Sequence, residues 1–409
     1  MAETSTLEAR YRPGKEREGI AVCLSGGGFR AALFHAGALR RLNELGILSR
    51  VRTVSSVSGG SIASGLLATV WPKLERDGDS FTNLGTLFEQ PLRAFCGGNI
   101  RNWPLLWGRL DPRNWPRLLS SSFSATDLLV AEYERLLGSI RLSALPSHPR
   151  FVFCAANLET GVSFELSARS VGDYVLGYSE PGHFTLAEAV AASSSFPFAF
   201  PPLVRVVDVD AFTGGDPKAV ASGFRPGPRV ALTDGGVYDN MGLEPAWKTH
   251  ATVLVSDGGT PFEIRARPRT WLVPRLQRSF QVVANQALAV RKRWLISAYL
   301  RGVYGGAYWG IGTDPDEYRV AGGARPAGYS GPVLDRLRVV RTDLDRFAPA
   351  EQSVLINHGW ALAGAALGRW GPNLATQPSL TGPPDPPLLD PDAALAALAE
   401  SDRFRFFGH

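Results

Sequence analysis

The feature that most constrains the fold is a pair of strand–glycine–helix units near the start of the chain. In the first, the apolar run 19–25 (GIAVCLS) leads into three glycines and then into a helical pattern that Gly46 ends. In the second, the run 51–57 (VRTVSSV) leads into a serine, two glycines and a helix expected over 59–70. Short loops between alternating strands and helices predict a parallel sheet with helices on both faces.

The remainder of the 409-residue chain continues this pattern around an interruption. Residues 72–147 are rich in Trp, Pro and Arg, which indicates a helical insertion or cap. Strand character then returns at 150–156, 163–167, 229–233 and 251–256. The sheet is therefore expected to resume after the insertion.

Composition favours a globular protein of the cytoplasm. No run of about 18 uncharged apolar residues is present, so the sequence predicts no membrane-spanning helix. The N-terminus has no apolar signal region, so no cleaved signal is expected. The three cysteines, Cys23, Cys96 and Cys154, are widely spaced, which favours buried thiols over a disulfide frame or a zinc site.

The first glycine cluster permits two kinds of ligand site. Gly26, Gly28 and Ala31 match the spacing of a dinucleotide-binding loop, but the following strand lacks the acidic residue that would hold a ribose. No Gly-Lys-Ser/Thr follows the glycines, which excludes an ordinary phosphate-binding loop. What remains is a row of peptide N–H groups at a helix N-terminus, which suits an anion. A Rossmann-like nucleotide-binding protein stays the less favoured alternative.

The second cluster, SVSGG at 56–60, lies where a nucleophile elbow belongs, between a strand and a helix. Ser58 is the candidate nucleophile, and the alternative is that Ser58 only caps the helix. None of the six histidines lies at a strand end, but two aspartates do, Asp234 (LTDGGVYDN) and Asp257 (LVSDGGTPF). In a parallel sheet both would reach the same edge as Ser58, and a desolvated carboxylate can act as a general base. Local features favour Asp234 only slightly.

Four segments taken together resemble the patatin-like phospholipase family. They are SGGGFRA (25–31), SVSGGS (56–61), SSSFPFAFPP (193–202) and DGGVYDN (234–240). The resemblance covers roughly residues 19–260 and implies an α/β three-layer sandwich with a largely parallel central sheet. We therefore expect an N-terminal extension at 1–18, a catalytic domain at 19–260 with the 72–147 insertion, and a helical C-terminal region at 261–409 packed on the same domain.

By the same resemblance the chain hydrolyses fatty acyl esters of lipids, as a phospholipase A-type enzyme or a lysophospholipase. Ser58 would be the nucleophile, Asp234 the base, and Gly26, Gly27 and Gly28 the oxyanion hole, with Arg30 supporting that loop; Asp257 would be structural. No metal or organic cofactor is implied. Two departures stand out: Ser56 replaces the first glycine of the elbow, where its Cβ is expected to narrow access, and Ala31 replaces the last glycine of the loop. They keep open a catalytically weak or silent interaction protein.

Two basic, tryptophan-containing segments suggest a partner. Residues 261–305 hold nine Lys or Arg against one acid, and residues 93–118 hold three Trp and five Arg against one acid. Indole and guanidinium groups together are typical of an anchor on an anionic membrane surface, whereas solvated helix faces are the alternative. We expect peripheral membrane contact through these segments and no nucleic acid partner.

Overall fold

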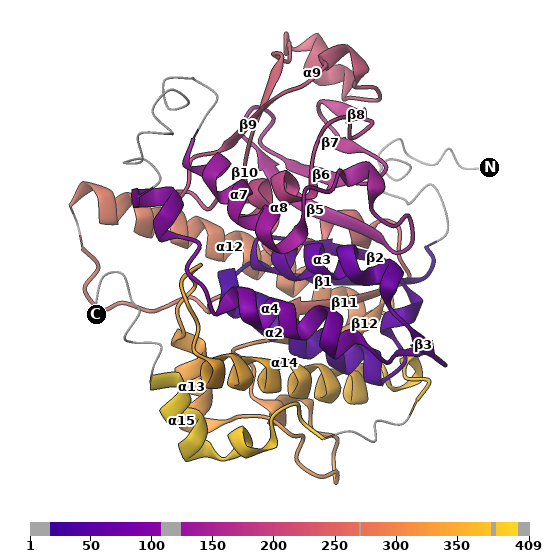
Figure 1. Ribbon diagram of the computed structural model, residues 1–409, viewed down its shortest axis with the longest axis vertical. Helices are drawn as coiled ribbons and strands as arrows, with labels where there is room; N and C mark the ends of the chain where they lie inside the picture. Colours follow the sequence, from indigo (N-terminus) through magenta and orange to yellow (C-terminus); the bar gives the residue numbers. More distant parts are fainter. Residues whose placement is uncertain (1–16, 108–123, 270, 378–381, 400–409) are drawn as a thin grey trace.

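A ten-stranded mixed sheet forms the centre of the molecule. The computed structural model describes residues 17–107, 124–269, 271–377 and 382–399 (Figure 1). The strands of the large sheet are β1 (Ile20–Leu24), β2 (Val51–Ser56), β5 (Arg150–Asn157), β6 (Ser163–Ser167), β7 (Val171–Asp173), β8 (Gly177–Ser179), β9 (Leu203–Val206), β10 (Arg229–Asp234), β11 (Thr252–Asp257) and β12 (Gly305–Gly310). A separate hairpin joins β3 (Arg76–Asp77) and β4 (Ser80–Phe81).

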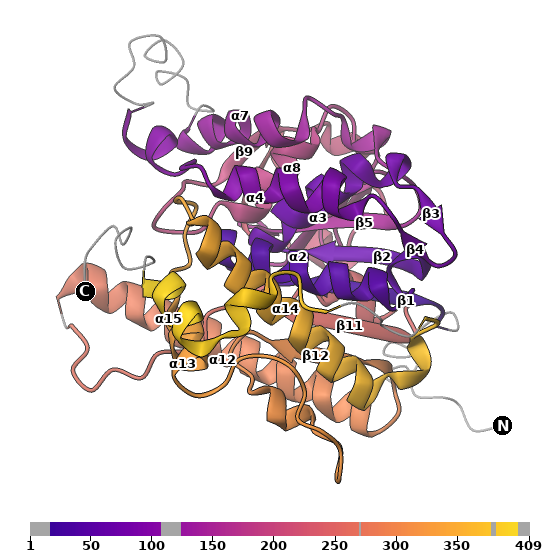
Figure 2. The ribbon, with the colours of Figure 1, turned by 60° about the horizontal axis from the view of Figure 1, so that its bottom comes forward.

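Helices cover this sheet on both faces (Figures 1 and 2). They are α2 (Gly28–Glu44), α3 (Gly59–Val70), α4 (Gln90–Cys96), α7 (Ala125–Leu137), α8 (Leu186–Ser194), α9 (Pro217–Ala221), α10 (Gly236–Asp239), α11 (Glu244–Trp247), α12 (Leu272–Leu300), α13 (Gly331–Val339), α14 (Pro349–Trp370) and α15 (Pro391–Ala399). Both strand–glycine–helix units are confirmed as β1–α2 and β2–α3. The predicted helix over 59–70 is confirmed at both ends.

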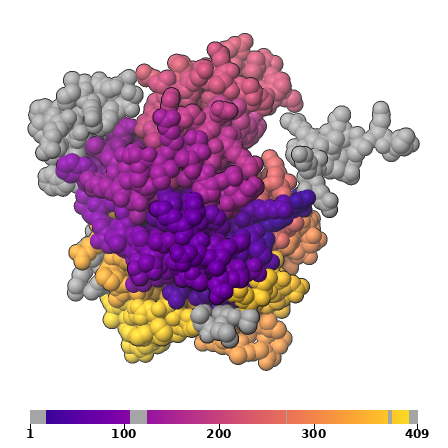
Figure 3. All heavy atoms as spheres, turned by 45° about the vertical axis from the view of Figure 1, so that its right-hand side comes forward, coloured from indigo at the N-terminus to yellow at the C-terminus, as the bar shows by residue number. Residues whose placement is uncertain are grey.

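The strand order confirms the predicted fold class. Five strands run parallel in the order β12-β11-β1-β2-β5, and β6, β7 and β8 continue antiparallel beyond β5. Strand β10 pairs antiparallel with both β5 and β9. The edge strand β12 comes from the C-terminal region, which otherwise packs as helices against the N-terminal part of the chain (Figure 3).

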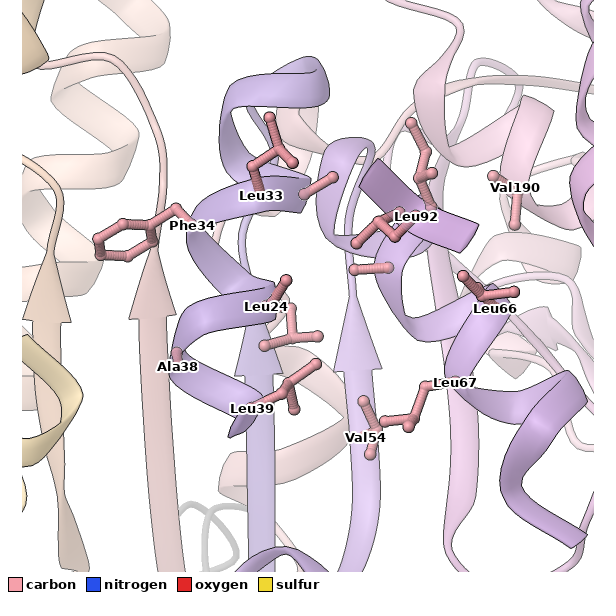
Figure 4. Packing of buried hydrophobic residues seen from close by; sticks show 14 of the residues in the cluster. Leu24, Leu33, Phe34, Ala38, Leu39, Val54, Leu66, Leu67, Leu92 and Val190 are labelled. Atoms are coloured by element: carbon pink, nitrogen blue, oxygen red, sulfur yellow. The ribbon is translucent and has the colours of Figure 1, made fainter. Parts of the chain in front are cut away.

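Strand β1 shows why the sheet needs covering on both sides, because its apolar side chains alternate between the two faces. Val22 and Leu24 belong to the main core, where α2 and α3 lie over β1 and β2 (Figure 4). Ala21 and Cys23 belong to a second apolar cluster that includes Leu295 of α12. All three cysteines are buried free thiols, as predicted. A strand buried on both faces must be apolar throughout, and β1 is.

Among the described helices, α2 and α14 make the most extensive contact, and they lie side by side (Figures 1 and 2). Reciprocal glycines allow the backbones to touch: a Cβ on Gly37 would overlap the carbonyl of Ile356, and a Cβ on Gly359 would overlap the carbonyl of Phe34. The C-terminal region is thereby fixed to the helix that follows the glycine loop.

Gly359→Ala tests this contact. Although alanine favours a helix over glycine by about 1 kcal/mol, we expect this change to lower the free energy of unfolding by about 1–3 kcal/mol, because the helices must separate. Gly368→Ala in the same helix is the matched control, since a Cβ there meets no atom within 4 Å. Urea denaturation measures both variants, and equal stability for the two would contradict the close approach.

Candidate active site

Ser58 lies in a strained turn between β2 and α3. Its φ of 50° and ψ of −114° fall in a region that side chains rarely adopt, at a cost of about 1–3 kcal/mol. A side chain of α8 holds it there: the Ser58 N–H donates to Ser193 Oγ at 3.0 Å. Although Ser58 occupies the N-cap position of α3, its hydroxyl makes no capping hydrogen bond. The simple capping alternative is therefore wrong.

The Ser58 side chain instead lies beside the carboxyl of Asp234 and acts to lower the pKa of that carboxyl. Asp234 is 3% exposed, and its Oδ1 also accepts the Gly236 N–H at 2.7 Å. Burial raises the pKa of Asp234 to about 6, although the Gly236 N–H and the Ser58 side chain both act to lower it. The site thus holds a hydroxyl against a carboxylate that is largely ionised at pH 7 and is still basic enough to accept a proton.

The route by which Asp234 reaches Ser58 differs from the prediction. Strand β10 is antiparallel to β5, so its carboxyl end reaches Ser58 from the opposite direction and not from a neighbouring parallel strand. Instead β2 and β10 pair with successive stretches of β5 and meet end to end. Ser56 lies opposite Phe153 and Asp234 lies opposite Ala155, two residues further along the same strand. The shared partner strand therefore brings the two catalytic candidates together.

Asp257, the other candidate, is occupied elsewhere. Its carboxyl accepts the Tyr308 hydroxyl at 2.7 Å and the Gly259 N–H at 2.9 Å. Its strand β11 is parallel to β1, so the expected strand-end position holds for Asp257, but the structure brings Asp234 to Ser58. His35 is also internal: its ring bridges Ser256 Oγ and the Ser25 carbonyl, and burial lowers its pKa to about 4.

The glycine loop adjoins Ser58 as expected. A Cβ built on Gly26 would lie 3.1 Å from Ser58 Cβ, and a Cβ on Gly59 would overlap the Gly28 carbonyl. The N-termini of α2 and α3 therefore meet, which concentrates positive potential at this point. Gly27 and Gly28 have φ of 146° and 59°, so other residues would be strained there.

The three glycines differ in how their N–H groups are used. The Gly26 N–H donates to the Asn240 carbonyl at 3.0 Å. Within the part of the chain that the structure describes, the N–H groups of Gly27 and Gly28 have no hydrogen-bond acceptor. Only these two donors of the expected oxyanion hole are thus available to a ligand.

Arg30 lies beneath the loop and is fully buried. Its guanidinium donates to the Gly258 carbonyl, at 3.2 Å from Nε and 2.7 Å from Nη2, and to the Val340 carbonyl at 2.9 Å. Burial lowers its pKa to about 10, although the charge of Asp257 opposes that shift. Arg30 therefore joins the first turn of α2 to two distant loops.

A buried group of serine hydroxyls supports the elbow, and sequence reasoning missed it. Ser56 Oγ accepts from Ser61 at 3.1 Å and from Ser64 at 2.6 Å. Ser61 also contacts Ser193 Oγ at 2.8 Å, and Ser193 donates to the Cys154 carbonyl at 2.6 Å. The Ser56 side chain is completely buried, so the expectation that its Cβ narrows access is wrong. The run of serines at 193–195 was the available signal.

Asp234→Asn tests the electrostatics of the site through stability. Because the pKa of Asp234 is higher in the folded protein than in the unfolded chain, ionisation costs folding free energy as the pH rises from about 4 to about 6. Asparagine avoids that cost. We expect the variant to be more stable than wild type at pH 7.5 by on the order of 1–3 kcal/mol, with the difference shrinking toward pH 4. Chemical denaturation at both pH values measures it; a variant less stable at pH 7.5 would contradict this.

Comparisons with known proteins show the family to which the chain belongs. The family model described as patatin-like phospholipase matches residues 22–247. No curated protein matches the chain. Among solved structures, human GIVD cytosolic phospholipase A2 is similar at 13% identity and a TM-score of 0.47, over 93% of this chain and 63% of that chain. The same human protein in complex with methyl gamma-linolenyl fluorophosphonate and terbium chloride is similar at 15% identity and a TM-score of 0.48, over 93% and 60%.

VipD from Legionella pneumophila is similar at 14% identity and a TM-score of 0.33, over 87% of this chain and 67% of that chain. The chain thus spans about three fifths of the length of the human protein. The family match covers more than half of the chain. This protein therefore belongs to the patatin-like phospholipase family, a family of lipid hydrolases.

Proposed function

We propose that this protein hydrolyses fatty acyl esters of phospholipids through a Ser58–Asp234 dyad, as a phospholipase A-type enzyme or a lysophospholipase. The observation that carries the proposal is the placement of the Ser58 side chain beside the buried Asp234 carboxyl, at a strained elbow next to a glycine loop. The pKa of Asp234, about 6, suits a base that must accept and return a proton near neutral pH.

The mechanism begins with attack of Ser58 Oγ on the acyl carbonyl carbon while its proton passes to Asp234. The carbonyl oxygen gains negative charge, which the N–H groups of Gly27 and Gly28 stabilise. The ester C–O bond then breaks, and the leaving alkoxide takes the proton from Asp234. Water attacks the acyl-enzyme and gives its proton to Asp234. The fatty acid leaves as Ser58 recovers its proton.

The remaining parts of the proposal concern organisation and location. We propose residues 19–260 as the catalytic domain, since Ser58, Asp234 and the glycine loop all lie within it, with 72–147 as an insertion and 261–409 as a region packed on it. Three buried free thiols support a cytoplasmic location. Contact with a membrane would be peripheral.

Ser58→Ala and Asp234→Asn test the dyad. We expect each to lower ester hydrolysis by about 1,000-fold or more, because the nucleophile or its base is removed. Asp257→Asn is the matched control and should stay within a few-fold of wild type. Mass spectrometry of mixed phospholipids incubated with each folded variant gives both the products and the rates. Hydrolysis that persists in Ser58→Ala, or its absence in wild type, would overturn the proposal.

The pH dependence of Ser58 reactivity tests the role of Asp234 separately. The ionised carboxylate is the active base, so the rate of Ser58 labelling by a fluorophosphonate should rise about tenfold per pH unit below the pKa of about 6 and level off above it. Intact-protein mass spectrometry follows the labelling, and Ser58→Ala should remain unlabelled. A flat profile between pH 4.5 and 8 would exclude Asp234 as the base.

A further inference from the structure

Helix α12 presents an apolar stripe to solvent. Along its length five large apolar residues recur on one face, at positions i, i+4, i+11, i+18 and i+22. They are Leu272, Leu276, Val283, Val290 and Trp294, exposed by 57%, 53%, 67%, 46% and 40%. The opposite side carries Leu295, which packs against the second apolar cluster. Before Leu295 no residue of the helix is buried.

This arrangement departs from the usual pattern, in which a surface helix turns its apolar face inward and its polar face outward, because α12 carries large apolar residues on both faces. A contiguous exposed apolar face marks an interaction site. The first turns of α12 also extend past the body of the molecule (Figures 1 and 2). None of the described helices, α12 included, is long and apolar enough to cross a membrane.

The charges on α12 indicate what this stripe contacts. The helix contains five cations and no Asp or Glu. Some of the cations serve the fold: Arg291 pairs with Glu244 at 2.9 Å, and Arg278 donates to the Glu263 carbonyl at 2.7 Å. Arg275 and Arg293 are exposed. Because they are 18 residues apart, they lie on the same side of the helix, next to the apolar stripe. Apolar residues flanked by cations match an anionic lipid surface.

The stripe is also continuous with the candidate site. Phe280 of α12 lies next to the stripe on the helix surface. It packs against Phe196 and Phe198, with ring centroids 6.2 and 5.7 Å apart. Both phenylalanines are exposed, by 45% and 59%. They follow Ser195, whose carbonyl accepts the Asp234 N–H at 3.1 Å. Ring contacts therefore join α12 to the loop that follows Ser195, the residue whose backbone holds Asp234.

The other segment predicted to contact membranes, 93–118, contributes less. Arg93 donates to Ser353 Oγ at 2.6 Å, and Arg101 pairs with Asp343 and Asp345. Trp103 is 41% exposed. Trp115 and the remaining arginines of the segment, Arg109, Arg113 and Arg117, lie outside the described residues.

We infer that the α12 stripe is the surface on which the protein rests on an anionic phospholipid bilayer, with Phe196, Phe198 and Phe280 forming the apolar passage from the lipid to Ser58. The part of this inference that concerns the passage to Ser58 rests on the proposed function. The part that concerns docking rests on α12 alone. Helix α12 lies outside the residues that match the family model.

Vesicle sedimentation with the full chain tests the docking. The double variant Leu276→Asp/Val283→Asp places two charges on the stripe and should weaken partitioning onto vesicles of phosphatidylglycerol and phosphatidylcholine at least tenfold. Val220→Asp is the matched control, because Val220 of α9 is also exposed, by 54%, and should bind as wild type does. Arg275→Gln/Arg293→Gln should reduce the salt dependence of binding. Unchanged binding by the stripe variant would overturn the inference.

Hydrolysis measurements separate this inference from the proposed function. The stripe variant should hydrolyse vesicle phospholipid at least tenfold more slowly than wild type and a short-chain soluble ester at the wild-type rate. If wild type hydrolyses no ester while the stripe variant still loses vesicle binding, the docking stands and the proposed function fails. Light scattering tests the alternative that the stripe mediates self-association. The docking inference would be overturned if wild type were a dimer, the stripe variant were a monomer, and both bound vesicles equally well.

Discussion

The contact on which the site depends is the close approach of two helix N-termini. The Gly28 carbonyl lies against Gly59, so no side chain fits between the start of α2 and the start of α3. This contact fixes the glycine loop beside the Ser58 turn and sums the positive ends of two helix dipoles at one point. The strained φ of Ser58 persists because the elbow is held on both sides, by the loop and by Ser193.

The sequence was sufficient to predict the parts of the structure that depend on local pattern. Strand β1, helix α3 and the elbow follow from apolar runs and glycines, and the order of the motifs identified Ser58 and Asp234 together. The direction of β10 was not predictable in this way, since a strand has the same alternation whichever way it runs. The predicted parallel direction was wrong for β10, although Asp234 does meet Ser58. Short strands such as β7 and β8, with three residues each, carry too little pattern to be recognised.

The hydrogen-bond partners of the site residues were also not predictable from the sequence. Ser56 reads as a departure from the elbow pattern, yet its hydroxyl belongs to a buried group of serines drawn from β2, α3 and α8. A serine is tolerated at position 56, in place of glycine, because the space behind the elbow is polar. Arg30 is a similar case: sequence reasoning assigned it a supporting role, but its partners, the carbonyls of Gly258 and Val340, lie more than 200 residues away.

These distant partners bear on how the protein is made. The first turn of α2 is held by the carbonyls of Asp343 and Val340, and α2 itself is covered by α14. During synthesis the ribosome releases the glycine loop some 300 residues before these partners. The nascent chain therefore carries an unfixed loop and an uncovered helix until α14 has emerged, and the site can be assembled only after that point.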